Sequence, residues 1–261
     1  MTRITIIGSG HVATHLASAF QAGGCCIGHV CSRTLAHAQA LAQAVGAQAS
    51  DRVEELPPAD LYIIAVTDSA IREVADRLDA GHAPVVHTAG SIPLAALDKF
   101  PRAGVLYPLQ TFSRRHGIHW ASVPVFIEAR DDETLSLLKA YALRLSPNVR
   151  VADSALRLRL HTSAVFACNF VNGLLSVAAD LSGAHFPVLY PVVCATVEKA
   201  FAAPHPRDVQ TGPAVRNDRD TMATQRALLP PEYRLLYDEL SDFIVRRMQN
   251  LPPSTTENRN Q

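Results

Sequence analysis

The sequence predicts an α/β Rossmann fold, a doubly wound parallel sheet over residues 1–151, followed by an all-α domain over residues 152–250. Short β-rich runs alternate with helical patterns in the first half. Several of these runs are apolar on both faces, as central parallel strands are when helices cover both sides. After about Ala152 the strand signals end, while helical spacing continues between prolines and glycines.

The individual elements follow from this alternation. Strands are predicted over residues 3–7, 27–31, 61–66, 85–88, 105–107 and 123–127. Helices are predicted over residues 11–21, 36–45, 69–78 and 132–145, and in the second half over 153–184, 187–201 and 232–248. With right-handed crossovers, the carboxyl ends of the parallel strands share the edge where such sheets hold ligands. Residues 251–261, two prolines followed by polar side chains, are predicted to be a disordered tail.

The charge balance favours neither nucleic acid nor an anionic membrane as a partner, because Lys+Arg and Asp+Glu number 24 each. The most membrane-like stretch, residues 163–184, contains Asn169, Asn172 and Asp180, which would be costly in lipid. We therefore expect it to form a helix buried in protein. No secretory signal pattern precedes the first strand, and the five cysteines include no C-x-x-C spacing. A cytoplasmic, reducing location is expected.

A glycine-rich turn follows the first predicted strand and opens a helix, with the sequence Gly8-Ser9-Gly10-His11-Val12-Ala13. It matches the pattern G-x-G-x-x-A. The first glycine makes a tight turn, the second lets backbone approach a pyrophosphate, and the alanine lets the helix pack closely on the strand. The helix N-terminus adds free N–H groups and a partial positive charge. A tight turn without a ligand is the alternative, but the βαβ context favours dinucleotide binding.

The end of the second strand predicts which dinucleotide is bound. A carboxylate normally lies there in NAD-binding domains, whereas this chain has Ser32-Arg33-Thr34. A carboxylate would repel a 2′-phosphate, while Arg33 can donate charge-assisted hydrogen bonds to it, each contributing about 1.5–3 kcal/mol. The Ser32 and Thr34 hydroxyls can add donors. The alternative is a helix cap with a surface arginine, and NADP is the cofactor we predict.

Two further strand ends lie at the same predicted edge. Val66, Thr67 and Asp68 follow one strand, and we expect their backbone near the cofactor, with Asp68 or Ser69 also capping the next helix. Thr88, Gly90 and Ser91 belong to the run His87-Thr88-Ala89-Gly90-Ser91 after the next strand. Thr88 and Gly90 are predicted cofactor contacts. Ser91 is a predicted substrate contact, with a role as the cap before Ile92-Pro93 as its alternative.

Taken together, the chain resembles Rossmann-like NADP oxidoreductases akin to deazaflavin-dependent NADP reductases and pyrroline-5-carboxylate reductases. More broadly it is similar to the β-hydroxyacid and 6-phosphogluconate dehydrogenase superfamily. The segments that carry the resemblance are residues 8–13, 32–34, 87–91, 107–112, 161–172 and 211–218. The resemblance implies a helical C-terminal domain that forms a homodimer, with the active-site cleft between the two domains. Related hydroxyacid dehydrogenases carry a lysine four residues before an asparagine, but Val165 precedes Asn169 here, so their lysine-based proton transfer does not carry over.

A polar seam on the first long helix of the second half supplies the candidate chemistry. His161, Asn169 and Asn172 fall within about 80° of arc on an ideal α-helix, with Phe166 and Phe170 opposite. We hypothesise that His161 is the general acid–base, that Asn169 orients the substrate and that Asn172 contacts it. The alternative is that His161 packs against the first domain and the asparagines bond across helices.

Three other side chains are candidate substrate contacts. Tyr107 follows the sixth strand, where prephenate-type enzymes carry a His-Pro pair, and it either donates a proton or only packs. Gln110 is a plausible amide contact. Arg216, after the predicted helix start at Gly212-Pro213, either clamps a substrate carboxylate across the dimer or forms an interface ion pair with Asp218.

The sequence therefore predicts an NADP-dependent oxidoreductase that transfers hydride to or from a small molecule. Two alternatives stay open: hydride exchange between NADP and a flavin or deazaflavin, which needs no side-chain acid, and a non-catalytic NADP-binding or sensing protein. No pair of histidines with a carboxylate has metal-ligand spacing, and no G-x-S-x-G elbow is present, so neither a metal site nor hydrolysis is predicted.

Overall fold

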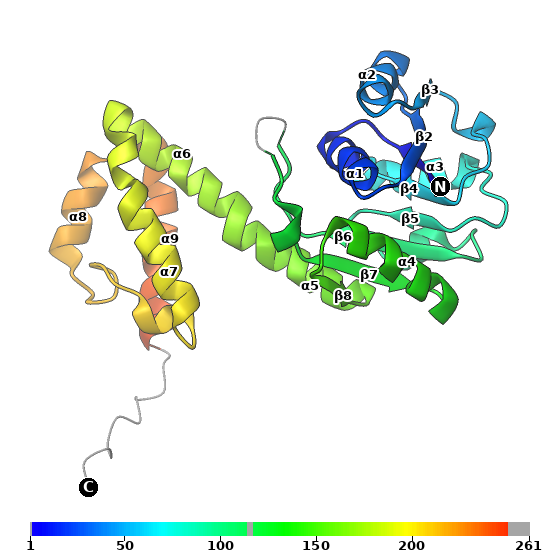
Figure 1. Ribbon diagram of the computed structural model, residues 1–261. Coiled ribbons are helices and arrows are strands. Elements are labelled where there is room, and N and C mark those ends of the chain that lie inside the picture. Colours follow the sequence, from blue (N-terminus) through cyan, green and yellow to red (C-terminus); the bar gives the residue numbers. More distant parts are fainter. Residues whose placement is uncertain (1, 114–116, 250–261) are drawn as a thin grey trace, which may run out of the picture. The chain divides into compact units, whose positions relative to one another are not determined.

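The computed structural model of the chain describes residues 2–113 and 117–249 (Figure 1). The predicted tail over residues 251–261 lies outside the described residues. Contacts divide the chain into two compact units, of which the first ends at Cys168 and the second begins at Asn169. The sequence places the boundary after Val151, whereas the contacts assign the helix that follows, α5 (Ser154–Ala164), to the first unit.

The first unit contains one eight-stranded sheet with the strand order β3-β2-β1-β4-β5-β6-β7-β8. The strands are β1 (Arg3–Ile7), β2 (Cys26–Cys31), β3 (Gln48–Ser50), β4 (Leu61–Ile64), β5 (Val85–His87), β6 (Ala103–Pro108), β7 (Val125–Ala129) and β8 (Val149–Val151). β1 to β6 pair in parallel. β7 is antiparallel to β6, and β8 runs parallel to β7. The Rossmann-type sheet is thus confirmed, with a reversed pair of strands at one end.

Helices cover both faces of this sheet, as the apolar strands require. They are α1 (His11–Ala22), α2 (Leu35–Val45), α3 (Ile71–Arg77), α4 (Asp132–Leu145) and α5, with short 3₁₀ helices at Val53–Glu55, Asp68–Ala70, Leu94–Leu97 and Trp120–Ser122. α1, α2 and α4 bury Leu16, Leu41 and Leu138 in one core, while α3 buries Ile71 in another. A third cluster, around Tyr107 and Phe126, receives Leu160 of α5.

The regular elements of the second unit are all helices in its described residues, as predicted. A π-helical segment, Val165–Phe170, spans the division and leads into α6 (Val171–Ser182). It is followed by the 3₁₀ helix Gly183–Leu189, α7 (Tyr190–Ala202), the 3₁₀ helix Pro206–Val209, α8 (Arg219–Leu228) and α9 (Pro231–Gln249). The helix expected to start at Gly212-Pro213 begins only at Arg219, because the Asp218 side chain accepts a hydrogen bond from the Thr221 backbone N–H and caps α8 there.

Large apolar side chains of the second unit are exposed, including Phe201 at 85%, Leu228 at 80%, Val188 at 74% and Leu235 at 70%. The helical stretch Ser154–Ala202 is long and apolar enough to cross a membrane by length and composition, and its most apolar window is not buried within the described structure. This chain alone therefore does not bury residues 163–184, and their burial in protein stays a prediction.

Candidate functional site

A pocket of about 770 Å³ lies at the carboxyl edge of the sheet, where the glycine-rich turn joins β1 to α1. Gly8 has φ +126°, and a Cβ there would stand 2.1 Å from the carbonyl oxygen of Ala65, so only glycine fits. A Cβ on Gly10 would meet no protein atom within 4 Å. The missing side chain of Gly10 therefore leaves open space on the outer side of the turn. Ala13 is fully buried between α1 and the sheet. This division of roles is the one that a pyrophosphate turn requires.

The first turn of α1 offers its backbone donors to this pocket. Gly10 occupies the N-cap position and provides no side-chain hydrogen bond. His11 and Val12 line the pocket, and the His11 Nδ1 atom lies 3.2 Å from the Phe112 carbonyl oxygen. Phe112 itself lines the pocket, a contact that sequence reasoning missed because the segment after β6 carries no pattern that predicts its return to α1.

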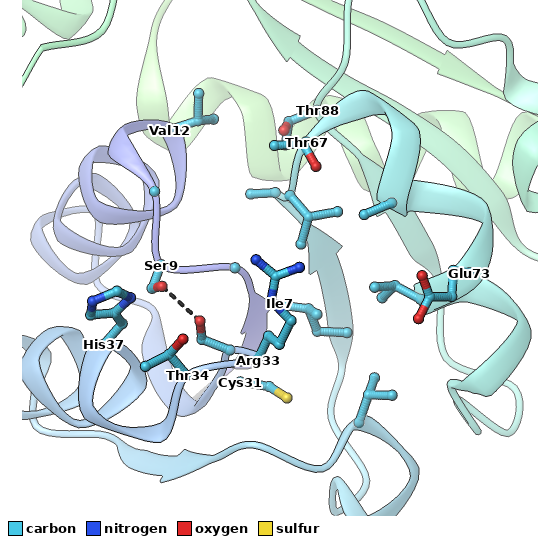
Figure 2. A pocket seen from close by; sticks show the side chains of 18 of the residues that line it. Ile7, Ser9, Val12, Cys31, Arg33, Thr34, His37, Thr67, Glu73 and Thr88 are labelled. Carbon is cyan, nitrogen blue, oxygen red and sulfur yellow. Dashed lines mark hydrogen bonds between the residues drawn. The ribbon is translucent and has the colours of Figure 1, made fainter.

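The end of β2 brings Ser32, Arg33 and Thr34 to the same pocket (Figure 2). The Ser9 and Ser32 hydroxyl oxygens are 2.8 Å apart, which ties this strand end to the phosphate turn. Thr34 precedes α2 but makes no side-chain cap hydrogen bond, so the capping alternative is wrong for Thr34. Arg33 points into the pocket and forms no ion pair among the described residues.

His37 joins this group and was not predicted from the sequence. It lies three residues after Thr34 on α2, and that spacing on a helix is the signal that would have found it. Arg33, His37 and hydroxyls therefore surround the end of β2, while Val53, Ala70 and Val74 supply apolar lining. Asp51, Glu73 and Arg77 also line the pocket, and Arg77 pairs with Glu54 and Glu73. This donor set fits a dinucleotide with a 2′-phosphate. Cys31 also lines the pocket, and burial raises the pKa of its thiol to about 11, so it stays a protonated, unreactive thiol.

The ends of β4 and β5 meet beside this pocket. Val66, Thr67, Asp68 and Thr88, the cofactor contacts predicted at these strand ends, line it. The Ser91 hydroxyl donates a hydrogen bond to the Asp68 carboxylate. Because that carboxylate is used across strands, Asp68 makes no helix-cap hydrogen bond, and neither does Ser91 before Leu94. The expected cap roles of both residues are therefore wrong, and the pair instead joins the two strand ends.

Tyr107 and His161 form a hydrogen-bonded pair at this edge. The Tyr107 hydroxyl oxygen and His161 Nδ1 are 2.9 Å apart, and the two rings meet edge to face. Tyr107 is 7% exposed, and burial raises its pKa to about 12, so it stays a phenol at neutral pH. As a phenol, Tyr107 either donates its proton to Nδ1 or accepts from Nδ1–H, according to the tautomer and charge of His161. His161 itself is only partly buried and accessible to a substrate.

Gly90 lies against both members of this pair. A Cβ there would stand 2.5 Å from His161 Nδ1 and 2.8 Å from Tyr107 Cζ, distances that no real side chain tolerates. Gly90 does not line the dinucleotide pocket. The glycine after β5 thus makes room for His161, a role that the sequence could not indicate because the two residues are far apart in the chain.

The remaining predicted substrate contacts are Gln110 in the first unit and Asn169, Asn172 and Arg216 in the second. The Gln110 amide oxygen accepts hydrogen bonds from Thr111, at 2.7 Å from its backbone nitrogen, which turns that oxygen away from any ligand. Asn169, Asn172 and Arg216 belong to the second unit and stay predictions. The π-helical segment Val165–Phe170 changes the residue spacing on which their common helix face was predicted.

Asp218 bonds to Thr221 and forms no ion pair with Arg216 among the described residues. Within residues 2–113 and 117–249, no group of three His, Cys, Asp or Glu side chains could hold a metal ion.

Comparison with known proteins places these features in context. Residues 3–89 match the family model described as "NADP oxidoreductase coenzyme F420-dependent", and residues 123–244 match the model "Domain of unknown function (DUF2520)". A Bacteroides fragilis protein to which NADP oxidoreductase activity is ascribed is 38% identical, with a TM-score of 0.86, and the alignment covers 94% of this chain and 98% of that one. None of the curated proteins matches the sequence.

More distant solved structures share the fold. The protein TM1727 from Thermotoga maritima is 20% identical with a TM-score of 0.76, over 94% of this chain and 99% of that chain. A reductive aminase from Aspergillus terreus, solved with NADPH and ethyl-5-oxohexanoate, is 17% identical with a TM-score of 0.71, over 95% of this chain and 94% of that chain.

Proposed function

Because the chain belongs to the Rossmann-like NADP oxidoreductase family, we propose that it binds NADP and transfers a hydride between this cofactor and a small molecule. The observation that carries the proposal is the hydrogen-bonded Tyr107–His161 pair, which lies at the same sheet edge as the dinucleotide pocket. A protein that only binds a nucleotide has no use for a proton-transfer pair at that edge.

The cofactor is held by the groups that line the pocket. The backbone N–H groups of the turn from Gly8 to Ala13 receive the pyrophosphate at the start of α1. Arg33, with Thr34 and His37 beside it, binds the 2′-phosphate. When bound, NADP supplies the hydride donor or acceptor, and the protein supplies position, a proton partner and electrostatics.

His161 is the general acid–base in this proposal. Tyr107 is buried and keeps its proton, so its hydroxyl holds Nδ1 and orients the imidazole. With Nδ1–H donating to the Tyr107 oxygen, the imidazolium form of His161 gives its Nε2 proton to a substrate heteroatom as hydride reaches the adjacent carbon. This leaves the neutral imidazole, whose Nε2 takes the proton back in the opposite direction. Tyr107 acts here as the orienting group and not as the acid.

The direct test measures NADPH oxidation and NADP reduction with panels of carbonyl compounds, imines and alcohols. Turnover in the wild-type protein, lowered at least about tenfold in His161→Gln with unchanged NADPH affinity, supports the proposal. His82→Gln is the matched control, because His82 is exposed in the turn before β5, at the opposite edge of the sheet. Unchanged turnover in His161→Gln removes the histidine from the mechanism.

A second candidate is hydride exchange between NADP and a deazaflavin, favoured by the F420-dependent family model that matches residues 3–89. This reaction moves a hydride between two cofactors and needs no side-chain acid. Activity with a deazaflavin that is insensitive to His161→Gln supports it. NADP affinity without turnover on any panel supports the sensing alternative.

We further propose that the protein is a cytoplasmic homodimer in which a second copy covers the apolar side chains of the second unit. The support is their exposure, above all at Val188, Phe201 and Leu235, since so much apolar surface is unusual on a monomer. Light scattering should give twice the chain mass, and Phe201→Glu should shift it toward the monomer. A monomeric wild-type protein that floats with lipid vesicles would contradict the dimer and favour a membrane surface.

A further inference from the structure

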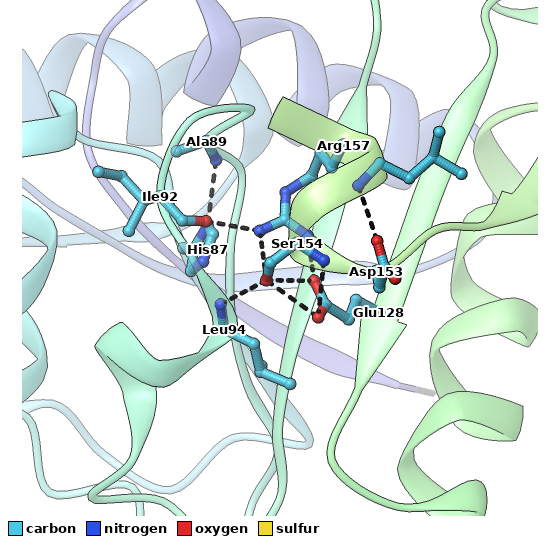
Figure 3. A network of polar contacts seen from close by, with 9 residues as sticks. His87, Ala89, Ile92, Leu94, Glu128, Asp153, Ser154 and Arg157 are labelled. Carbon is cyan, nitrogen blue, oxygen red and sulfur yellow. Dashed lines mark hydrogen bonds and ion pairs between the residues drawn. The ribbon is translucent and has the colours of Figure 1, made fainter. Parts of the chain in front are cut away.

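A buried cationic side chain of the first unit belongs neither to the pocket nor to the Tyr107–His161 pair. Arg157 on α5 is only 1% exposed (Figure 3). Its guanidinium donates to the Glu128 carboxylate on β7, to the Ile92 carbonyl oxygen at 2.5 Å and to the Ser154 hydroxyl at 3.2 Å. One planar group thus bonds to three chain segments at once.

Ser154 completes the network. Its hydroxyl accepts a hydrogen bond from the Leu94 backbone N–H at 3.0 Å and donates to the Glu128 carboxylate, which also accepts from the Ser154 backbone N–H at 3.0 Å. The first turn of α5, the end of β7 and the segment after β5 are therefore joined by polar groups with fixed directions.

The cost of this arrangement argues for a role other than stability. Removing a guanidinium and a carboxylate from water is expensive, and well-packed apolar side chains of similar volume commonly stabilise a protein as well as a buried ion pair does. Apolar contacts, unlike hydrogen bonds, do not fix the orientation of one segment relative to another. A buried pair that bonds to three segments specifies how those segments are placed.

Each segment in the network contains, or pairs with, a residue of the group formed by His161, Gly90 and Tyr107. His161 lies four residues after Arg157, about 6 Å along the α5 axis. Gly90 lies two residues before Ile92, and the backbone of β7 pairs Phe126 directly with Tyr107. The network therefore fixes α5, which carries the imidazole, and the segment that carries the glycine, and it also bonds to β7, whose neighbour β6 carries the phenol.

We propose that Arg157, with Glu128 and Ser154, is a positioning residue that holds His161 over Gly90 and in hydrogen-bonding distance of Tyr107. This inference rests on the proposed function for its catalytic consequence, but its geometric content is independent of turnover. Arg157 does not line the pocket, so we expect its replacement to leave NADP affinity unchanged.

The test compares Arg157→Lys and the double variant Glu128→Leu/Arg157→Met with the wild-type protein. The matched control is Arg130→Met, which removes an exposed pair with Asp98 at the end of β7. Three quantities are measured: unfolding by urea, the ¹⁵N signals of the His161 imidazole (assigned by their loss in His161→Gln), and kcat and KM with any substrate found. The ¹⁵N signals report the hydrogen bond to Tyr107 whether or not a substrate is known.

The double variant is expected to fold with near wild-type stability, to lose the Nδ1 signal of the hydrogen-bonded imidazole, and to lower kcat about 10- to 100-fold with unchanged NADPH affinity. Arg157→Lys keeps the charge but not the planar fork, and is expected to change the same signals partly. If the double variant does not fold, the His161 signals of Arg157→Lys decide whether Arg157 positions the imidazole. Unchanged His161 signals in a folded variant overturn the inference. Changed signals without turnover in any protein leave the positioning role standing while the proposed function fails.

Discussion

His87, at the end of β5, is expected to make the folded protein sensitive to acid. Its ring is fully buried, and its Nδ1 atom accepts a hydrogen bond from the Ala89 backbone N–H. Burial, with the Arg157 charge adding to it, lowers the pKa of His87 from 6.5 to about 4. In the unfolded chain the same imidazole gains its proton at about pH 6.5.

The sign follows from which state binds the proton. Above about pH 6.5 the imidazole is neutral in both states and costs nothing. Between about pH 6.5 and about pH 4 only the unfolded chain binds the proton, so stability falls as the pH falls. At pH 5 the loss is about 2 kcal/mol, from one and a half pH units at about 1.4 kcal/mol each.

His87→Asn removes the titrating group while its amide oxygen can still accept from Ala89. Urea unfolding of both proteins from pH 7.5 to 4.5 isolates the contribution of His87, because the carboxylates that also titrate are common to both. The stability of the variant relative to wild type should rise by about 2 kcal/mol between pH 7 and pH 5. A difference that is constant over this range would refute the reasoning, since His87 would then titrate alike in both states.

Three further substitutions test the geometry. Gly90→Ala is expected to lower kcat about tenfold or more without changing NADPH affinity, because its Cβ would meet His161 Nδ1 at 2.5 Å; stopped-flow NADPH oxidation and a binding titration measure the two quantities. Arg33→Ala should weaken NADP binding about tenfold or more and leave NAD binding nearly unchanged, which calorimetry with both nucleotides measures, and an unchanged ratio would contradict the 2′-phosphate assignment. Lys99→Met should destabilise the protein by about 1–3 kcal/mol in urea, because its ammonium donates to the carbonyl oxygens of Asp76 and Leu78 at 2.7 and 2.8 Å at the end of α3; an unchanged midpoint would show that water replaces it.

The cofactor half of the site could be predicted because its information is local. The glycine turn and its strand and helix are contiguous, and the cofactor choice depends on residues directly after the second strand. The elements missed in the same half are β3 and β8, three residues each and too short to show a period of two. The reversal of β7 relative to β6 was missed too, because the apolar pattern of a strand does not encode its direction.

The network around Arg157 could not have been predicted in the same way. Arg157 and Glu128 are 29 residues apart and join a helix to a strand whose direction was unknown. On the sequence, an arginine in the run Leu156-Arg157-Leu158 looks like an exposed helical residue, and in the structure it is the least exposed residue of α5. A buried charge carries no sequence signal because its partner comes from the tertiary fold.

Gly90 is selected by the sequence for one reason and needed in the structure for another. The sequence selects it as a glycine at a sheet edge, where backbone commonly approaches a ligand. In the structure the missing Cβ is the space that His161 occupies beside Tyr107. The position of the imidazole is therefore specified from two directions, by the absence of a side chain on one segment and by the bonds of Arg157 on the others. An imidazole with only a packing role would need neither constraint, and their coincidence at the edge that holds the dinucleotide pocket is what favours an enzyme over a nucleotide sensor.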